Sequence, residues 1–130
     1  MNVEELFGFL KEDYGLSYKH QEFTNCYNGN WIVQTYSFFN DSGCFTILFL
    51  PQRNEIEFFC SKEFSRKYEK LSENSVDICT IEPDIWDKHT KVFGIRRPFF
   101  WWSKHKVLQA FAEALKVHLI KEKSFFGIIV

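Results

Sequence analysis

The sequence has little of what interrupts regular structure, with only three prolines and six glycines among 130 residues. That scarcity excludes collagen-like and low-complexity chains, in which glycine and proline dominate. Apolar residues make up 45% and charged residues 25%, and this balance excludes a disordered chain, which has too few apolar side chains to form a core. Because the length is ordinary for one domain and no repeat or linker divides the sequence, we expect a single domain over residues 1–130.

Cysteine patterns typical of metal sites are also lacking. The four cysteines stand at positions 26, 44, 60 and 79, so there is no C-x-x-C pair, which argues against a structural zinc site or a thioredoxin-like centre. The even count leaves two disulfides as an alternative. However, Glu4 and Glu5 stand where a secretory signal would carry basic residues. We therefore expect reduced, mostly buried thiols in a cytoplasmic protein.

Several further motifs are absent. No apolar run approaches the roughly 20 residues that span a bilayer, so we expect no membrane partner. Neither G-x-G-x-x-G, nor a glycine-rich loop followed by Lys-Ser/Thr, nor G-x-S-x-G occurs. These absences exclude the common phosphate-binding loops and the nucleophile elbow of hydrolases, and we expect no cofactor.

Two sets of side chains are candidates for a metal site or a catalytic nucleophile. One short stretch offers oxygen and imidazole ligands to a divalent metal: Glu82, Asp84, Asp87 and His89. It matches no known ligand spacing, and carboxylates beside Pro83 also suit a helix N-terminus. For a Cys–His nucleophile, His105 and His118 lie about 220° apart around one helix and cannot share a site from that helix alone. We predict no catalytic and no metal-ligating residue, and favour a non-catalytic role over an enzyme.

Turn signals separate stretches rich in β-branched and aromatic residues. Asn28-Gly29 is the strongest hairpin signal, because a type I′ turn needs positive φ at both central residues. Turns are also predicted over 40–43 and 51–54. The expected strands cover residues 16–27, 31–39, 44–50 and 55–60, with 76–81 as a fifth. Their connections are too short for parallel crossovers, so we expect an antiparallel meander.

The alternation within two of these strands predicts their place in the sheet. The strand over 44–50 is apolar on both faces, so we expect it in the centre of the sheet with cover on both sides. In the strand over 55–60, Ile56 and Phe58 share one face, whereas Glu55 and Glu57 share the other. This strand is expected to be half exposed, with an edge open to a partner strand.

Helical periodicity marks both ends of the chain. Residues 2–12 form an expected helix, with Asn2 and Glu5 as a capping box and Gly15 ending it. Residues 62–73 and a short segment from Pro83 are also expected to be helical. The strongest helix covers 104–123, and its apolar stripe is Leu108, Phe111, Leu115 and Leu119, widened by Val107, Ala110, Ala114 and Val117. The tail over 125–130 is expected as an edge strand, which gives an α+β fold with an N-terminal helix and C-terminal helices.

Charge is distributed unevenly although the net charge is only −1. Residues 1–60 hold three basic and eight acidic side chains, 3 − 8 = −5, whereas residues 61–130 hold 13 and nine, 13 − 9 = +4. Such polarity steers partners of opposite charge, although a helix with a solvated basic side would give the same count.

The sequence has 16 Phe, five Tyr and four Trp, more rings than a core must bury. Trp, Tyr and Arg are the residues that dominate binding hot spots. We therefore predict a protein partner and the following contact residues: Glu55, Glu57, Asp41, Trp31, Tyr36, Arg96, Arg97, Trp101 and Trp102. The alternative is a small-ligand or nucleic-acid-binding domain that uses the basic aromatic segment 96–106, against which the pI of about 6.4 counts.

Three stretches resemble small, uncharacterised bacterial proteins: residues 28–33 (Asn-Gly-Asn-Trp-Ile-Val), residues 51–55 (Pro-Gln-Arg-Asn-Glu) and residues 98–101 (Pro-Phe-Phe-Trp). The layout of a short helix, an antiparallel meander and a helical C-terminus is similar to that of immunity proteins of bacterial toxin systems. The resemblance implies a cytoplasmic inhibitor that binds and occludes one cognate toxin, often a nuclease.

Overall fold

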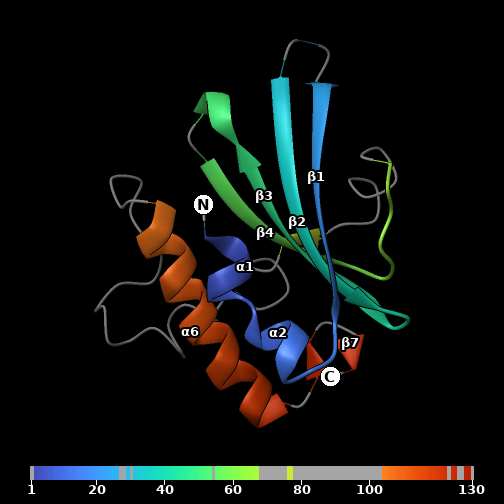
Figure 1. The fold of residues 1–130 in the computed structure, drawn as a ribbon, viewed down its shortest axis with the longest axis vertical. Helices are drawn as coiled ribbons and strands as arrows, with labels where there is room; N and C mark the ends of the chain where they lie inside the picture. The colour runs from blue at the N-terminus through green and yellow to red at the C-terminus, as the bar shows by residue number, and fades with distance from the viewer. Residues whose placement is uncertain are drawn as a thin grey trace.

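The computed structural model describes residues 2–26, 29, 31–53, 55–67, 76–77, 104–122, 124–125 and 128–129. Figure 1 shows an antiparallel sheet with helices packed against one of its faces. The helices are α1 (Val3–Leu6), α2 (Phe9–Glu12) and α6 (Lys104–Glu122), with a 3₁₀ turn η1 (Pro51–Arg53). The strands are β1 (Ser17–Cys26), β2 (Trp31–Asn40), β3 (Gly43–Leu50), β4 (Glu55–Ser61), β5 (Val76–Asp77), β6 (Ser124–Phe125) and β7 (Ile128–Ile129).

The predicted meander is confirmed. The order is β1-β2-β3-β4-β5 with antiparallel pairing throughout, and β3 lies in the centre as its apolar faces predicted. The first four strands agree with the expected ranges to within one residue. The fifth is described only as Val76–Asp77, which pairs with Phe59 and Cys60; residues 78–81 lie outside the described part. The end of β4 is therefore paired with β5, whereas we expected an edge of β4 to be open to a partner strand.

Local hydrogen bonds explain the turn between β2 and β3. The Asn40 Oδ1 atom accepts the Ser42 N–H at 2.8 Å and the Gly43 N–H at 3.1 Å, so an asparagine side chain closes the turn as predicted. The β3–β4 turn is η1, followed by Asn54, which lies outside the described residues along with Asn28 of the predicted β1–β2 turn.

The N-terminal segment is not one helix, as predicted, but two short ones separated at Phe7 and Gly8. At Gly8 the backbone turns so tightly that an added Cβ would lie 2.9 Å from the Glu4 carbonyl oxygen. Asn2 is the N-cap residue of α1, but its side chain makes no capping hydrogen bond. Gly15, at φ 68°, ends the segment as expected because a glycine adopts this conformation without strain.

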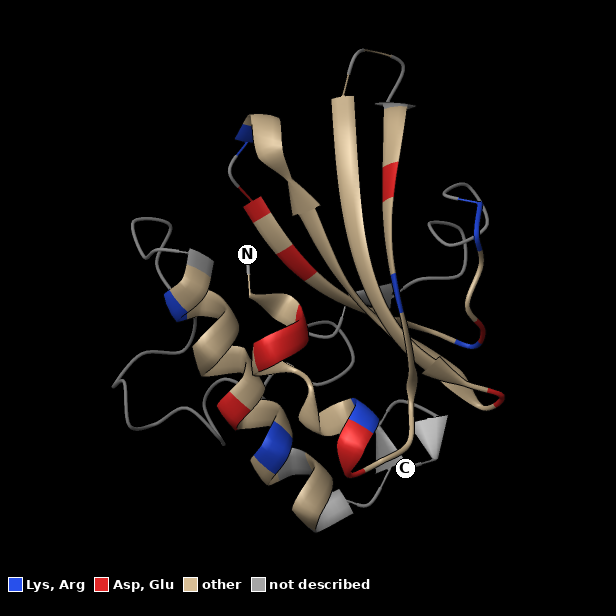
Figure 2. Ribbon diagram, viewed as in Figure 1, with Lys and Arg blue, Asp and Glu red and all other residues tan. Residues whose placement is uncertain are grey.

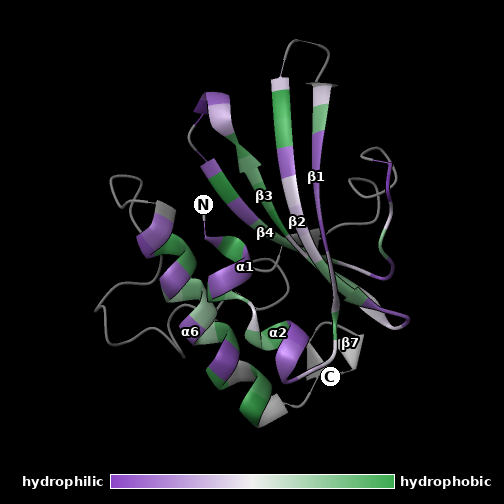
Figure 3. Cartoon of the chain, in the orientation of Figure 1, coloured by the Kyte–Doolittle hydropathy of each residue, from purple (hydrophilic) through white to green (hydrophobic). Residues whose placement is uncertain are grey.

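Helix α6 supplies most of the helical side of the core. Leu108, Phe111, Leu115 and Leu119 are buried, and the sheet contributes Phe38, Phe45, Ile47, Phe58 and Cys60 from its helix face. The expected stripe is wrong at its margin, because Val117 is 37% exposed whereas Ala112, which was not predicted, is buried. The hydropathy colours of Figure 3 alternate along α6 and the strands, as a two-layer core requires.

Phenylalanine rings join the two layers. The Phe111 ring stacks on Phe58 with 3.8 Å between the centroids and an interplanar angle of 7°, and its centroid lies 5.9 Å from that of Phe45 and 6.5 Å from that of Phe7. Phe7 also reaches Phe38 at 6.3 Å. One ring of α6 thus contacts α1–α2 and two strands at once.

Two further expectations are corrected. Residues 62–67 of the predicted 62–73 helix form bends without helical hydrogen bonds, and Phe64 instead stacks on Phe39 of β2 at 4.2 Å; residues 68–73 lie outside the described part. The tail does not join the main sheet as an edge strand, because β7 pairs with β6 in a separate two-stranded sheet. The short helix expected from Pro83 lies outside the described residues.

We predict that Phe111→Ala lowers the free energy of unfolding by about 3–5 kcal/mol, because it leaves a cavity where three other rings converge. Urea denaturation followed by circular dichroism measures the loss. The control is Ile120→Ala on the same helix, where the side chain is 73% exposed and the effect should stay within about 0.5 kcal/mol. Equal losses in the two variants would contradict this account of the core.

Candidate protein-interaction surface

The sheet has a second face, opposite the helices, with a polar centre. On it lie Thr35 and Ser37 of β2, Cys44 and Thr46 of β3, and Ser61 of β4, all of them buried. The Ser37 and Thr46 hydroxyls are 3.0 Å apart, and the Cys44 Sγ atom lies 3.4 Å from Thr46 Oγ1. We call this group the hydroxyl cluster.

The hydroxyl cluster gives Cys44 polar neighbours. Cys44 and Cys60 are free and buried, as predicted. Burial raises the pKa of the Cys44 thiol, while hydrogen bonds from neighbouring hydroxyls lower it. Because burial is the larger effect, Cys44 stays a neutral thiol and a poor nucleophile. Cys26 and Cys79 have no described side chains.

Two buried oxygen atoms, one beside the hydroxyl cluster and one within it, have no hydrogen-bond partner in the part of the chain that the structure describes: Gln21 Oε1 and Thr35 Oγ1. Gln21 and Thr35 are paired across β1 and β2, so both atoms lie in the same region of the face. Each such atom typically costs about 1–3 kcal/mol of stability.

Toward the β3–β4 turn, the same face becomes apolar. Val33, Leu48 and Leu50 are buried there, and three partly buried rings pack against them: Phe23, Trp31 and Phe59. This second, smaller apolar cluster is separate from the core beneath the helices. Its three aromatic rings are partly buried.

Charged and polar groups surround Trp31 at the end of this cluster. The Arg53 guanidinium lies 6.0 Å from the centre of the Trp31 ring, and its Nη2 atom is 3.2 Å from Glu55 Oε1. The Ile32 N–H donates to the Gln52 Oε1 atom at 3.2 Å, which ties η1 to the start of β2. We call Trp31, Gln52, Arg53 and Glu55 the Trp31 corner. Figure 2 shows a blue and a red segment on either side of the short connection from η1 to β4.

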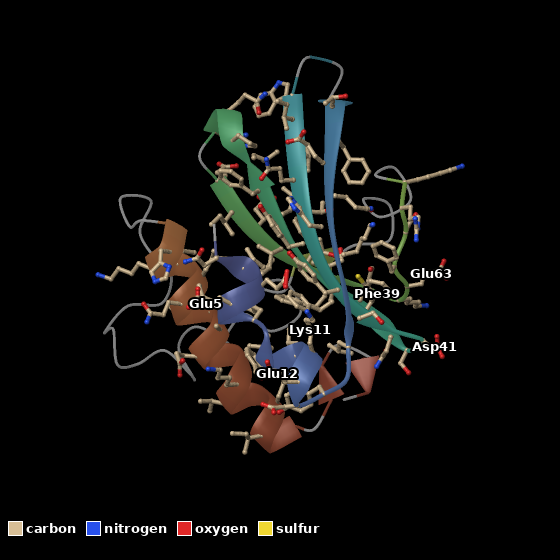
Figure 4. All side chains as sticks on the ribbon, in the orientation of Figure 1. Glu5, Lys11, Glu12, Phe39, Asp41 and Glu63 are labelled. Atoms are coloured by element: carbon tan, nitrogen blue, oxygen red, sulfur yellow. The ribbon has the colours of Figure 1, made fainter. Side chains whose placement is uncertain are left out.

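The structure brings some of the predicted contact residues together and separates others. Trp31 and Glu55 meet through Arg53, and Glu57 lies on the same face one step further along β4. Tyr36 is buried on the helix face instead, and Asp41 is exposed at the β2–β3 turn, at the other end of the sheet. Figure 4 labels Asp41 at the end of the sheet where β2 turns into β3. The remaining four residues lie outside the described part: Arg96, Arg97, Trp101 and Trp102.

Arg53 was missed as a candidate residue. The sequence placed it in a turn, and only its position between the starts of two strands makes it contact both Trp31 and Glu55.

Around Tyr36, the helix face carries a hydrogen-bonded row. The Tyr36 hydroxyl donates to Gln34 Oε1 at 3.1 Å, and Gln34 Nε2 donates to Glu22 Oε1 at 3.1 Å. His20 stacks on the Tyr36 ring with 4.2 Å between centroids. Further along the face, Tyr18 is more perturbed: burial first, and then the charge of Glu4, raise its pKa to about 12.

Across the described ranges, no three His, Cys, Asp or Glu side chains are placed to hold a metal ion. The candidate stretch of Glu82, Asp84, Asp87 and His89 lies outside them. None of the described helices is long and apolar enough to span a bilayer. No family model, curated protein or solved structure matches the chain.

We predict that Thr46→Val lowers the free energy of unfolding by about 1–3 kcal/mol, because it leaves the buried Ser37 hydroxyl without its bond. The double variant Ser37→Ala/Thr46→Val should lose less than the sum of the two single variants, since both break the same contact and neither hydroxyl is left without the other. Urea denaturation measures both, with Ser17→Ala on exposed β1 as the control. Strict additivity would show that the 3.0 Å contact contributes nothing.

A second prediction concerns alkaline pH. The pKa of Tyr18 is about 12 in the folded state and 10.0 in the unfolded state. As the pH rises, the Tyr18 hydroxyl therefore stays protonated to a higher pH in the folded state than in the unfolded state. The stability that Tyr18 contributes is therefore complete below pH 10 and is lost as the pH rises toward 12. Tyr18→Phe should flatten the decline of unfolding free energy over this range. Unchanged slopes in pH-dependent urea denaturation would contradict the assignment, and tyrosinate absorbance gives an independent titration.

Proposed function

We propose that this chain is a non-catalytic protein-binding module, an immunity-type inhibitor that binds and occludes a cognate toxin in the cytoplasm. The observation that carries the proposal is the Trp31 corner, where an aromatic ring, a guanidinium and a carboxylate meet above an incompletely covered apolar cluster. Trp and Arg are the residue types most enriched in binding hot spots.

The Trp31 corner is exposed and yet held in place. The side chains of Arg53 and Glu55 are 57% and 41% exposed, but the ion pair and the Trp31 ring restrain the guanidinium. A side chain that is already ordered loses less conformational entropy when a partner binds. The corner therefore favours recognition by a preformed surface over recognition by an adaptable loop.

Charge supports a cationic partner. Glu55 and Glu57 both project from β4 on the face opposite the helices, and residues 1–60 carry a formal charge of −5. A toxin that acts on nucleic acid presents a basic surface, and an acidic inhibitor is attracted to it over long range. The resemblance of the chain layout to immunity proteins supports this choice of partner.

The direct test uses the protein encoded by the reading frame next to this gene, purified and titrated calorimetrically with this chain. We expect binding, and we expect Trp31→Ala to weaken it by at least about 2 kcal/mol, or roughly thirtyfold. Arg53→Ala should weaken it as well. The matched control is Glu12→Gln, an exposed carboxylate on α2, which should leave the affinity unchanged.

Two results would contradict the proposal. One is a neighbouring protein that binds equally well to the Trp31→Ala and control variants. The other is salt-sensitive binding of generic RNA or single-stranded DNA by this chain in an electrophoretic shift assay, which would favour the alternative nucleic-acid role of segment 96–106.

A further inference from the structure

Strand β1 is the first strand in the order of the described sheet. Within the described residues its only strand neighbour is β2, and their register runs without interruption from Ser17 to Phe23. β1 has ten residues, longer than the usual five or six. In Figure 1 it lies at the margin of the sheet, beyond β2. Long, regular edge strands are templates for pairing with another strand.

Side chains of β1 are accessible on both faces. Ser17, Lys19, His20 and Glu22 are exposed. The common devices that block an edge are proline, a bulge and inward-facing charge. From Ser17 to Phe23, β1 has no proline and no register shift; the irregularity lies between Phe23 and Cys26. Charge is present, because Lys19 is exposed and Glu22 lies on the helix face, so a second strand must pair in a register that suits these charges.

From this edge we propose that two copies of the chain pair through β1 in antiparallel fashion, about a two-fold axis at Gln21, to form one continuous sheet. This inference does not depend on the proposed inhibitor role. Directly opposed residues in an antiparallel pair lie on the same face. Each face of the sheet therefore continues into the second copy only in registers where two opposed residues are an even number of positions apart in the sequence.

Charge then selects one register. With the axis at Gln21, His20 of each copy opposes Glu22 of the other, so an imidazole donor meets a carboxylate twice. An axis at Lys19 or Glu22 would oppose two like charges, which is destabilising. An axis at His20 would oppose two histidines and place Tyr18 against Glu22. Among these registers, only the one with the axis at Gln21 opposes His20 to Glu22, and on the other face it places Lys19 opposite Phe23.

The existing contacts of these residues are compatible with pairing. Glu22 Oε1 accepts one hydrogen bond from Gln34 Nε2, and a carboxylate has further acceptor sites. His20 stacks on Tyr36 through its ring face, which leaves its ring nitrogens at the edge. Both side chains are thus oriented by β2 before a second copy arrives, which lowers the entropy that pairing would cost.

The test measures the oligomeric state of the purified chain by sedimentation equilibrium. We expect a concentration-dependent species of twice the 15.6 kDa chain mass. Glu22→Lys should raise the dimer dissociation constant by at least about tenfold, because it opposes a cation to His20. The double variant H20E/E22K, which exchanges the two roles, should restore dimerisation. Glu5→Lys, the same charge reversal on α1, is the matched control and should have no effect.

A second measurement needs no variant. Hydrogen exchange of β1 amides should accelerate when the native protein is diluted below the dissociation constant, whereas exchange in central β3 should not. A monomer at every concentration overturns the proposal, as does a dimer that Glu22→Lys and Glu5→Lys affect equally. Protection of β1 that appears only with the neighbouring protein would assign the edge to a partner strand instead. Because the chain is measured alone, failure here leaves the inhibitor proposal standing.

Discussion

The contact between Phe58 of β4 and Phe111 of α6 is the interaction on which the architecture depends. Their rings lie 3.8 Å apart and nearly parallel, and rings from the N-terminal segment and from β3 pack around them. Helix and sheet come from distant parts of the chain, so this contact fixes the layer of helices on one face. Because the helices cover that face, the side chains on the opposite face of the sheet are the ones that they leave uncovered.

The opposite face combines a polar centre with an apolar end. Ser37, Cys44 and Thr46 satisfy one another in the hydroxyl cluster, which confers specificity because a register slip would separate them. At the apolar end, Trp31 and Phe59 are partly buried and pack against Val33, Leu48 and Leu50. The proposed contact surface is this end of the face.

The two proposed surfaces use different parts of the same sheet. The Trp31 corner lies at the ends of β2 and β4 and offers side chains, whereas the β1 edge offers backbone hydrogen bonds along a strand. A dimer through β1 would leave the β4 end of each copy open. The proposed inhibitor would then present two Trp31 corners, one from each copy, on one continuous sheet.

The sequence alone determined the four-stranded meander, the turn over 40–43, the central place of β3 and the burial of α6, because turn residues and period-two and period-3.6 patterns are local signals. It also placed Glu55 and Glu57 on one face of their strand. It could not determine the break at Gly8, the pairing of β7 with β6, or the polar surroundings of Cys44, which depend on contacts between segments. Tertiary structure also decided that Trp31 contacts Arg53 and that Tyr36 lies on the opposite face from Trp31. The reason is that strand register sets which side chains become neighbours.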